Sequence, residues 1–127
     1  MAIIKQDYGL LNGGGIAELL WTNSSPTTAF AAQTISVDLS SYDGVIIDAF
    51  WGDGDQPTVT NYHQYFYFPR ERWTYNYNRI YAYTGYRDVL SITDSGVEFG
   101  TFSGGSSLNQ RVVPIAIYGV NGFTIES

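Results

Sequence analysis

The residues best suited to chemistry lie between Tyr62 and Tyr86, a segment that holds eight of the eleven tyrosines of the chain. From Trp73 onward, aromatic or charged side chains recur at every second position. The members of this alternating row are Trp73, Tyr75, Tyr77, Arg79, Tyr81 and Tyr83. A period of two is the period of a β-strand, so the spacing predicts one strand over 72–83 with the whole row on one face. Tyrosine beside Asn and Arg is typical of recognition surfaces, because its ring is rigid and amphipathic.

The alternating row has two interpretations at this point. As a binding surface, its rings would form a platform for apolar sugar faces, and Arg79 would bond an anionic group or a hydroxyl. Aromatic residues are also favoured in strands, where such a row forms a wall of the core or an interface between subunits. Exposed rings would indicate a ligand site, whereas rings that face a symmetry-related copy would indicate assembly.

Catalytic and metal-binding patterns are sparse in this sequence. His63 is the only histidine, cysteine is absent and no G-x-S-x-G motif occurs, so neither a Ser-His-Asp triad nor a zinc site is predicted. Asp53 and Asp55 flank Gly54 and are the best candidates for a Ca²⁺ site, but a solvated acidic turn is the preferred interpretation because so few ligands accompany them. A glycosidase remains a third class, although no spacing selects a carboxylate pair. We therefore expect a protein that binds without catalysis, metal or cofactor.

Length and charge narrow the function classes further. A chain of 127 residues suits one ordinary domain with its own core. Its formal net charge of −6 argues against general binding of nucleic acid, which requires positive charge. No apolar run is long enough to span a membrane, and residues 1–11 lack the apolar core of a signal peptide. We expect synthesis in a cytosol and no membrane insertion.

Short alternating or apolar segments separated by turn signals predict strands along most of the chain. The predicted strands cover 16–21, 34–39, 45–51, 62–68, 72–83, 88–93, 97–102, 112–118 and 123–125, with one helical turn over 29–33. The apolar run 45–51 suits a central strand that is covered on both faces. This pattern predicts an all-β fold, specifically an antiparallel, jelly-roll-like β-sandwich. Residues 1–15 are expected to form a short extended N-terminal arm with a glycine hinge at Gly13–Gly15, followed by a single β-sandwich domain over 16–127.

Two groups of segments, together with the opening of the chain, carry a family resemblance. The first group is Leu20–Asn23, Pro26, Phe30, Gln33–Leu39 and Tyr42–Asp43; the second is Arg87–Thr93, Gly96–Phe99 and Val113–Val120. The opening residues are Asp7–Gly9 and Gly13–Gly15. With these segments, the chain resembles the small β-rich domains of tail-fibre, baseplate and minor structural proteins of tailed phages that infect Gram-positive and gut bacteria. The resemblance covers most of the chain outside 52–86.

The resemblance implies a virion protein that is made in the host cytoplasm and attaches the phage tail to its host. Its expected partners are a bacterial cell-surface polysaccharide and other tail proteins, and a homo-oligomer, with a trimer favoured, is the expected assembly. The unmatched segment 52–86 is where a receptor-binding region would be expected to diverge. The alternative is a structural tail or decoration subunit whose aromatic row is an oligomer interface. The resemblance carries no catalytic residue to this chain.

Overall fold

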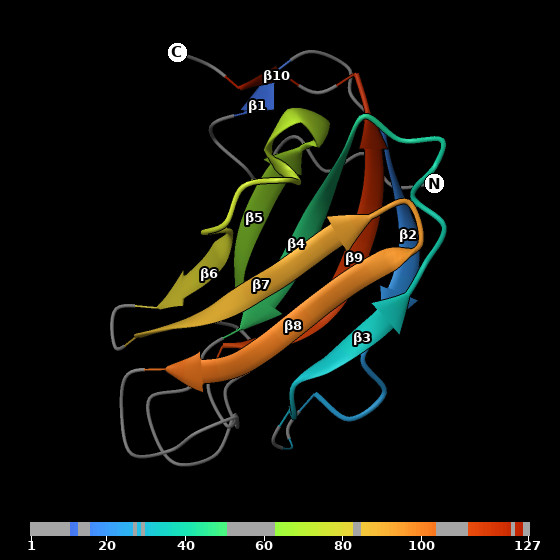
Figure 1. The fold of residues 1–127 in the computed structure, drawn as a ribbon. Helices are drawn as coiled ribbons and strands as arrows, with labels where there is room; N and C mark the ends of the chain where they lie inside the picture. Colours follow the sequence, from blue (N-terminus) through green and yellow to red (C-terminus); the bar gives the residue numbers. More distant parts are fainter. Residues whose placement is uncertain are drawn as a thin grey trace.

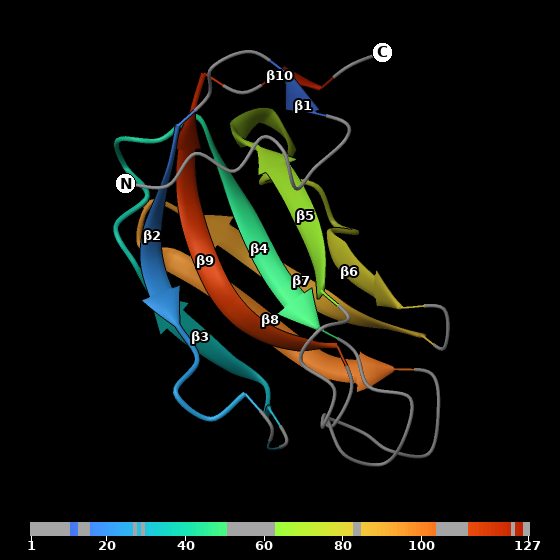
Figure 2. The same cartoon turned by 180° about the vertical axis from the view of Figure 1, so that it is seen from behind.

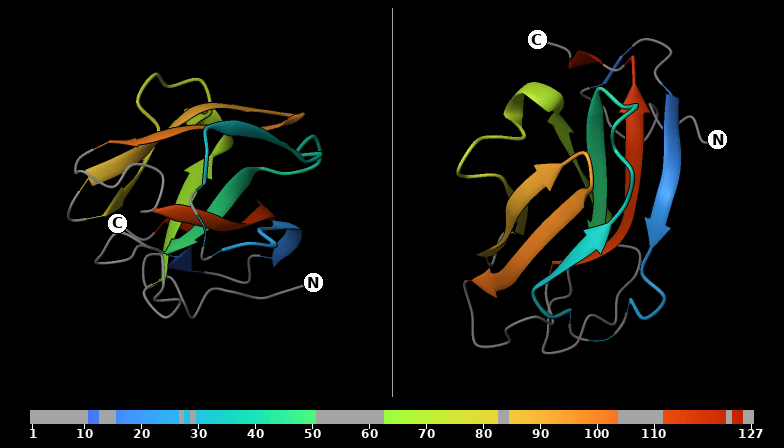
Figure 3. Two further views of the ribbon diagram at one scale, coloured as in Figure 1. Left: turned by 90° about the horizontal axis from the view of Figure 1, so that it is seen from below. Right: turned by 45° about the vertical axis from the view of Figure 1, so that its right-hand side comes forward.

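The computed structural model describes residues 11–12, 16–26, 28, 30–50, 63–82, 85–103, 112–122 and 124–125. Two antiparallel four-stranded sheets pack face to face (Figure 1). Sheet I contains, in spatial order, β2 (Ile16–Thr22), β9 (Val113–Asn121), β4 (Gly44–Phe50) and β5 (His63–Pro69). Sheet II contains β3 (Gln33–Ser36), β8 (Gly96–Ser103), β7 (Gly85–Thr93) and β6 (Arg79–Ala82). The predicted all-β, antiparallel sandwich is confirmed, and the left panel of Figure 3 shows its two layers from one end.

The strand pairing explains which strands lie at the edges. The first two strands of the sandwich pair with the last two, β2 with β9 and β3 with β8, in the nested manner of a jelly roll. The inner strands instead pair with their neighbours in the chain, β4 with β5 and β6 with β7. As a result, β5 is an edge of sheet I and β6 is an edge of sheet II. A single 3₁₀ turn, η2 (Arg70–Arg72), and residues 73–78 connect these two edges.

Apolar side chains from the two inner sheet faces form the core. Alternate residues of β4 point into it, and the ring of Phe99 on β8 meets the ring of Phe30 edge to face at 5.6 Å between centroids. The opposite face of β4 is covered as well, because Ile46 is fully buried with Ala17 and Val120. The expectation of a doubly covered strand is therefore confirmed for β4.

Arg87 is an arginine inside this core. Its Nε donates to the carbonyl of Val112 at 2.8 Å, and its Nη1 donates to the carbonyls of Phe30 at 3.0 Å and Gly100 at 2.8 Å. Burial lowers the pKa of Arg87 to about 10, because the charged form loses its hydration. The guanidinium thereby ties β7 to β8 and to the chain segments that precede β3 and β9.

One local prediction is only partly correct, and another is wrong. The single strand over 72–83 is replaced by η2 and turns, and only Arg79–Ala82 is a strand. The amide of Trp73 donates to the carbonyl of Arg70 at 3.1 Å and that of Tyr75 to the carbonyl of Arg72 at 3.1 Å, so this stretch makes turn bonds three residues apart instead of a strand ladder. No helical turn occurs at the described positions of 29–33, where β3 begins at Gln33.

Two short strands near the beginning and the end of the described chain pair with each other. Leu11 and Asn12 form β1 (Leu11–Asn12), which pairs antiparallel with β10 (Thr124–Ile125) (Figure 2). The remaining residues of the expected arm, including the glycine hinge Gly13–Gly15, lie outside the described residues. Across the residues described, no helix has the length and apolar character needed to cross a bilayer.

Candidate functional site

The six residues of the alternating row do not share one environment. Trp73 is buried, with 6% of its surface exposed, whereas Tyr75, Tyr77 and Tyr81 are 56%, 75% and 52% exposed. Arg79 is half-buried beside them, and Tyr83 lies outside the described residues. The structure thus brings Tyr77, Arg79 and Tyr81 together and assigns Trp73 to the core, and it contradicts the prediction of a single six-residue face.

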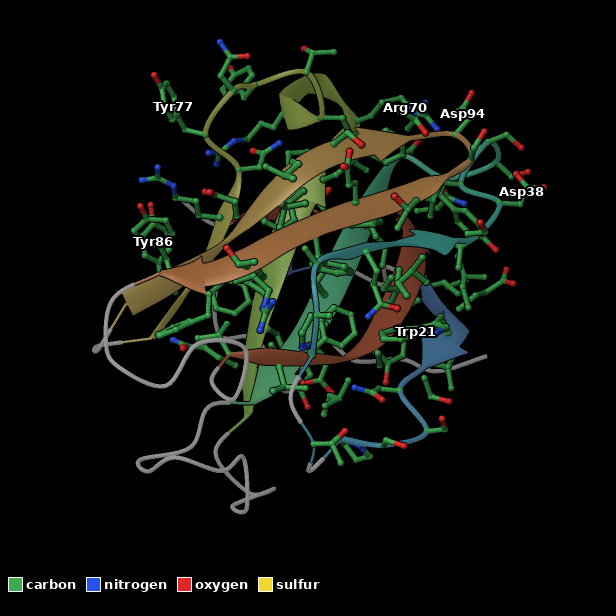
Figure 4. All side chains as sticks on the ribbon, turned by 60° about the horizontal axis from the view of Figure 1, so that its bottom comes forward. Trp21, Asp38, Arg70, Tyr77, Tyr86 and Asp94 are labelled. Atoms are coloured by element: carbon green, nitrogen blue, oxygen red, sulfur yellow. The ribbon has the colours of Figure 1, made fainter. Side chains whose placement is uncertain are left out.

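Trp73 belongs to a rigid group of contacts that we call the Arg70 corner, consisting of Arg70, Trp73, Asp94 and the carbonyls of Leu39 and Tyr42. The indole Nε1 of Trp73 donates to the carbonyl of Phe68 at 2.9 Å, and the Arg70 guanidinium lies 4.2 Å from its ring centroid. Arg70 also donates to the carbonyls of Tyr42 and Leu39 at 2.7–3.0 Å and pairs with Asp94 at 2.8 Å. Figure 4 shows Arg70 and Asp94 side by side, well separated from Tyr77. This corner anchors the connection between the sheets and offers no free charge.

On the open side of the sandwich, a cleft of about 300 Å³ lies between the edge strands β5 and β6. We call it the β5–β6 cleft; its lining residues are Tyr65, Phe66, Tyr67, Phe68, Arg72, Tyr77, Asn78, Arg79 and Tyr81. Four consecutive residues of β5 line it, so one wall is the edge of that strand. At a sheet edge, every second residue directs its backbone N–H and C=O away from the neighbouring strand. The cleft therefore combines aromatic rings with backbone hydrogen-bonding groups.

Arg79 is held in place by a neighbouring carboxylate. Its Nε donates to Oδ1 of Asp88 at 2.9 Å, as their direct opposition across β6 and β7 allows. Its Cζ lies 4.1 Å from the ring centroid of Tyr86 and 5.7 Å from that of Tyr77. The hydrogen bond with Asp88 raises the pKa of Arg79, while partial burial opposes the rise. Arg79 thus positions tyrosine rings, and its charge is already balanced.

Arg72 has a different environment. Its side chain is exposed, and no carboxylate among the described residues lies within ion-pair distance of it. Its Cζ lies 5.4 Å from the ring centroid of Tyr75. The backbone carbonyl of Arg72 accepts hydrogen bonds from the Tyr75 amide at 3.1 Å and from Nδ2 of Asn78 at 2.8 Å. The main chain of Arg72 is therefore fixed while its guanidinium is available.

Asn78 is the most unusual polar residue of the cleft wall. It is only 3% exposed, its Nδ2 is used by Arg72, and its backbone carbonyl accepts the amide of Val89 at 2.9 Å. Its Oδ1 is buried and has no hydrogen-bond partner within the described part of the chain. An unsatisfied buried acceptor costs about 1–3 kcal/mol, and this cost accompanies the hydrogen bond by which Asn78 holds the main chain of Arg72.

Tyr67 supplies a fixed phenol to the same wall. Its ring packs over Gly44, where an added Cβ would lie only 2.7 Å from Cε1 of Tyr67. Burial raises the pKa of Tyr67, and the negative charges of Asp43 and Glu71 raise it further. The hydroxyl therefore stays protonated at neutral pH.

The described lining of the cleft contains no carboxylate. Among the described residues, no group of three or more His, Asp or Glu side chains gathers as a metal site would require. The sequence candidates Asp53 and Asp55, together with the imidazole of His63, lie outside the part of the chain whose side chains are described. The arrangement of the cleft is suited to stacking, hydrogen bonding and contact with one unbalanced cation.

Sequence reasoning missed Tyr65, Tyr67, Arg72 and Asn78 as cleft residues. Pro69 was the available signal, because a proline after an aromatic strand marks its end and separates the aromatic segment into two structural units. The burial of Asn78 had no sequence signal, since it depends on contacts made by the folded connection. The chain matches no family model, no curated protein and no solved structure.

Proposed function

We propose that this protein binds a bacterial surface glycan, without transforming it, through the β5–β6 cleft. The observation that carries the proposal is the group of exposed tyrosines around this cleft, with Tyr77 at 75% and Tyr81 at 52% exposure. A group of exposed rings around one cleft provides aromatic faces, and sugar rings present apolar C–H faces that stack on them. The edge of β5 supplies backbone hydrogen-bonding groups for sugar hydroxyls.

The size of the cleft suits a short portion of a glycan. Sites for small molecules commonly occupy about 300–1,000 Å³, and a volume of about 300 Å³ is at the lower end of this range. The cleft is also partly open to solvent, so a polysaccharide chain can continue beyond it. An affinity based on one short glycan segment is modest, and repeated copies of the site would increase it through avidity.

The setting that we propose is host attachment by a phage tail, in the virion. Its support is the position of the segments on which the sequence-based expectation of a tail protein rests, most of which lie on β2, β3, β7, β8 and β9. The lining of the cleft falls within 65–81, outside those segments. This division is the one expected of an attachment protein that keeps a common scaffold and varies its receptor site.

Binding to whole cells and to their purified wall polysaccharide tests the proposal. Wild-type protein should bind cells of a susceptible strain from a panel of Gram-positive and gut bacteria, and Tyr77→Ala should reduce binding. Leu90→Ala is the matched control, because Leu90 is an exposed apolar residue of β7 that does not line the cleft. Periodate oxidation of the cells should abolish binding, whereas protease treatment should leave it unchanged. The opposite result would indicate a protein receptor and contradict the proposal.

Two further measurements test the absence of chemistry. Binding should persist in EDTA, and incubation with the polysaccharide should release no reducing ends. Reducing ends that disappear with a single Asp or Glu substitution would identify a glycosidase instead.

The second candidate function is a structural tail or decoration subunit in which these tyrosines contact another copy. Its supporting observation is that Ile16 and Leu19 on the edge strand β2 are also exposed, so the molecule has more than one apolar surface. Light scattering distinguishes the two functions. A stable trimer that becomes monomeric with Tyr77→Ala, and that does not bind cells, would favour the structural role.

A further inference from the structure

We infer that the β5–β6 cleft selects glycans that carry an anionic substituent, a carboxylate or a phosphate, and that Arg72 is its charge partner. The inference rests on the proposed function and specifies the class of ligand. The starting observation is a difference among the arginines that the structure describes. Arg70 is paired with Asp94, and Arg79 is paired with Asp88. Arg87 is fully buried and bonded to carbonyls, which leaves Arg72 as the unbalanced cation at the cleft.

Arg72 is placed to use its charge. Its carbonyl is bonded by two donors from the following turn, so the main chain is fixed, while its guanidinium is solvent-exposed and faces no described carboxylate. A guanidinium offers paired N–H groups whose geometry matches carboxylate and phosphate oxygens. Such charge-assisted pairs are roughly twice as strong as neutral hydrogen bonds.

Selectivity for an anionic glycan must arise at the cleft, because the protein as a whole is negatively charged. The formal net charge of −6 repels anions at long range, so affinity for an anionic glycan must come from the site itself. Glu71 is adjacent to Arg72 in η2, and its negative charge contributes to the raised pKa of Tyr67 in the cleft wall. Arg72 therefore places an attractive charge at the cleft, while Glu71, which does not line the cleft, places a repulsive charge nearby, and each can be removed separately.

Asn78 supports Arg72 from the wall of the cleft. Its side chain holds the carbonyl of Arg72 at 2.8 Å, so the two residues are structurally coupled. Its Oδ1 lacks a donor among the described residues. That oxygen is buried, so Asn78 acts on the ligand only through the main chain of Arg72 that it holds.

The first test is an array of bacterial surface polysaccharides that includes neutral, carboxylate-bearing and phosphate-bearing members. The inference predicts that wild-type protein binds charged members and that added salt weakens this binding. Binding to neutral members with equal affinity would overturn the inference and leave the proposed function in place. Binding to none of the glycans would overturn both.

The second test removes the charge from the ligand. The bound polysaccharide is treated either by chemical reduction of its carboxyl groups or by removal of its phosphate with cold hydrofluoric acid. The treatment that matches its substituent should reduce affinity about 10- to 100-fold, since a hydrogen bond to a charged group contributes about 1.5–3 kcal/mol. Unchanged affinity after both treatments would contradict an anionic ligand, whatever happens to the protein variants.

The third test changes the protein. Arg72→Gln should produce a similar loss with the charged ligand and no loss with the neutralised ligand, whereas Arg72→Lys should retain part of the affinity. Gln33→Glu is the matched control, because it makes the same change in net charge on β3, at the opposite edge of sheet II from β6. Equal losses in Arg72→Gln and Gln33→Glu would show a general electrostatic effect and overturn the role of Arg72.

Discussion

The Arg70 corner and the tyrosines at the β5–β6 cleft come from one short stretch of sequence. The side chains of the corner are held by contacts within the protein, whereas the tyrosines are exposed to solvent. Arg70 and Trp73 donate hydrogen bonds to backbone carbonyls and make a cation–π contact with each other. Tyr75 and Tyr77, a few residues later, project into solvent. Composition does not distinguish the two halves, since both consist of aromatic residues and arginines. The difference is whether the polar atom of each side chain finds a partner within the fold. Residues that do are structural, and residues that do not remain available to a ligand.

The largest expected effect is at Trp73. Trp73→Ala should lower the free energy of unfolding by about 3–5 kcal/mol, because it removes a buried ring and leaves the Phe68 carbonyl without its donor. Urea unfolding followed by circular dichroism measures the change. A loss below about 1 kcal/mol, the size typical of exposed positions, would place Trp73 outside the core.

Arg70 should have the next largest effect on stability. Arg70→Ala removes its bonds to the Tyr42 and Leu39 carbonyls and its pair with Asp94, and should cost about 1–2 kcal/mol, since partial exposure screens the ion pair. Arg72→Ala is the matched comparison and should change stability by less than about 0.5 kcal/mol. Equal costs at both positions, measured in the same urea series, would remove the distinction between an anchored and an available arginine.

Tyr77 should show the reverse pattern. Tyr77→Ala should reduce glycan affinity by about 1–3 kcal/mol, as at contact hot spots, while unfolding changes by less than about 0.5 kcal/mol. Titration calorimetry and urea unfolding on the same preparation separate the two quantities. A large loss of stability with unchanged affinity would show that Tyr77 supports the fold and does not contact the ligand.

The smallest effect is expected at Glu71. Glu71→Gln should strengthen binding of a charged glycan by about 0.2–1 kcal/mol, because it removes a like charge at an exposed position beside the cleft. The measurement is calorimetry at low salt with the charged ligand and with its neutralised form. Equal strengthening for both ligands would point to a change in packing and contradict the electrostatic explanation.

Most of the sandwich could be predicted because its strands are locally consistent. β4 reads as a continuous apolar run and is covered on both faces, and the alternation within Arg79–Ala82 places Ile80 inside and Arg79 and Tyr81 outside. At 73–78 the same period of two failed, because turn bonds to Arg70 and Arg72 replaced a strand partner. A periodic pattern predicts a strand only where a neighbouring strand is available to pair with it.

The charge state of the site could not be predicted from sequence. Arg79 was the expected partner of an anionic group, but the register of β6 with β7 places Asp88 directly opposite it. Arg70 lies in η2 and meets Asp94 in the turn between β7 and β8, across a separation of 24 residues. Which arginine stays unbalanced therefore depends on strand register and on the placement of turns, and neighbouring sequence does not reveal it.

The two walls of the β5–β6 cleft belong to different sheets, and this has a thermodynamic consequence. A ligand that touches both β5 and β6 binds only when the two layers are assembled, so it stabilises the native state by mass action. At a free concentration one hundred times the dissociation constant, this stabilisation is about 2.7 kcal/mol. A rise in the melting temperature of the protein therefore indicates that a ligand is bound. A mixture of wall fragments can be fractionated by the upward shift that each fraction causes, before any of its sugars has been identified.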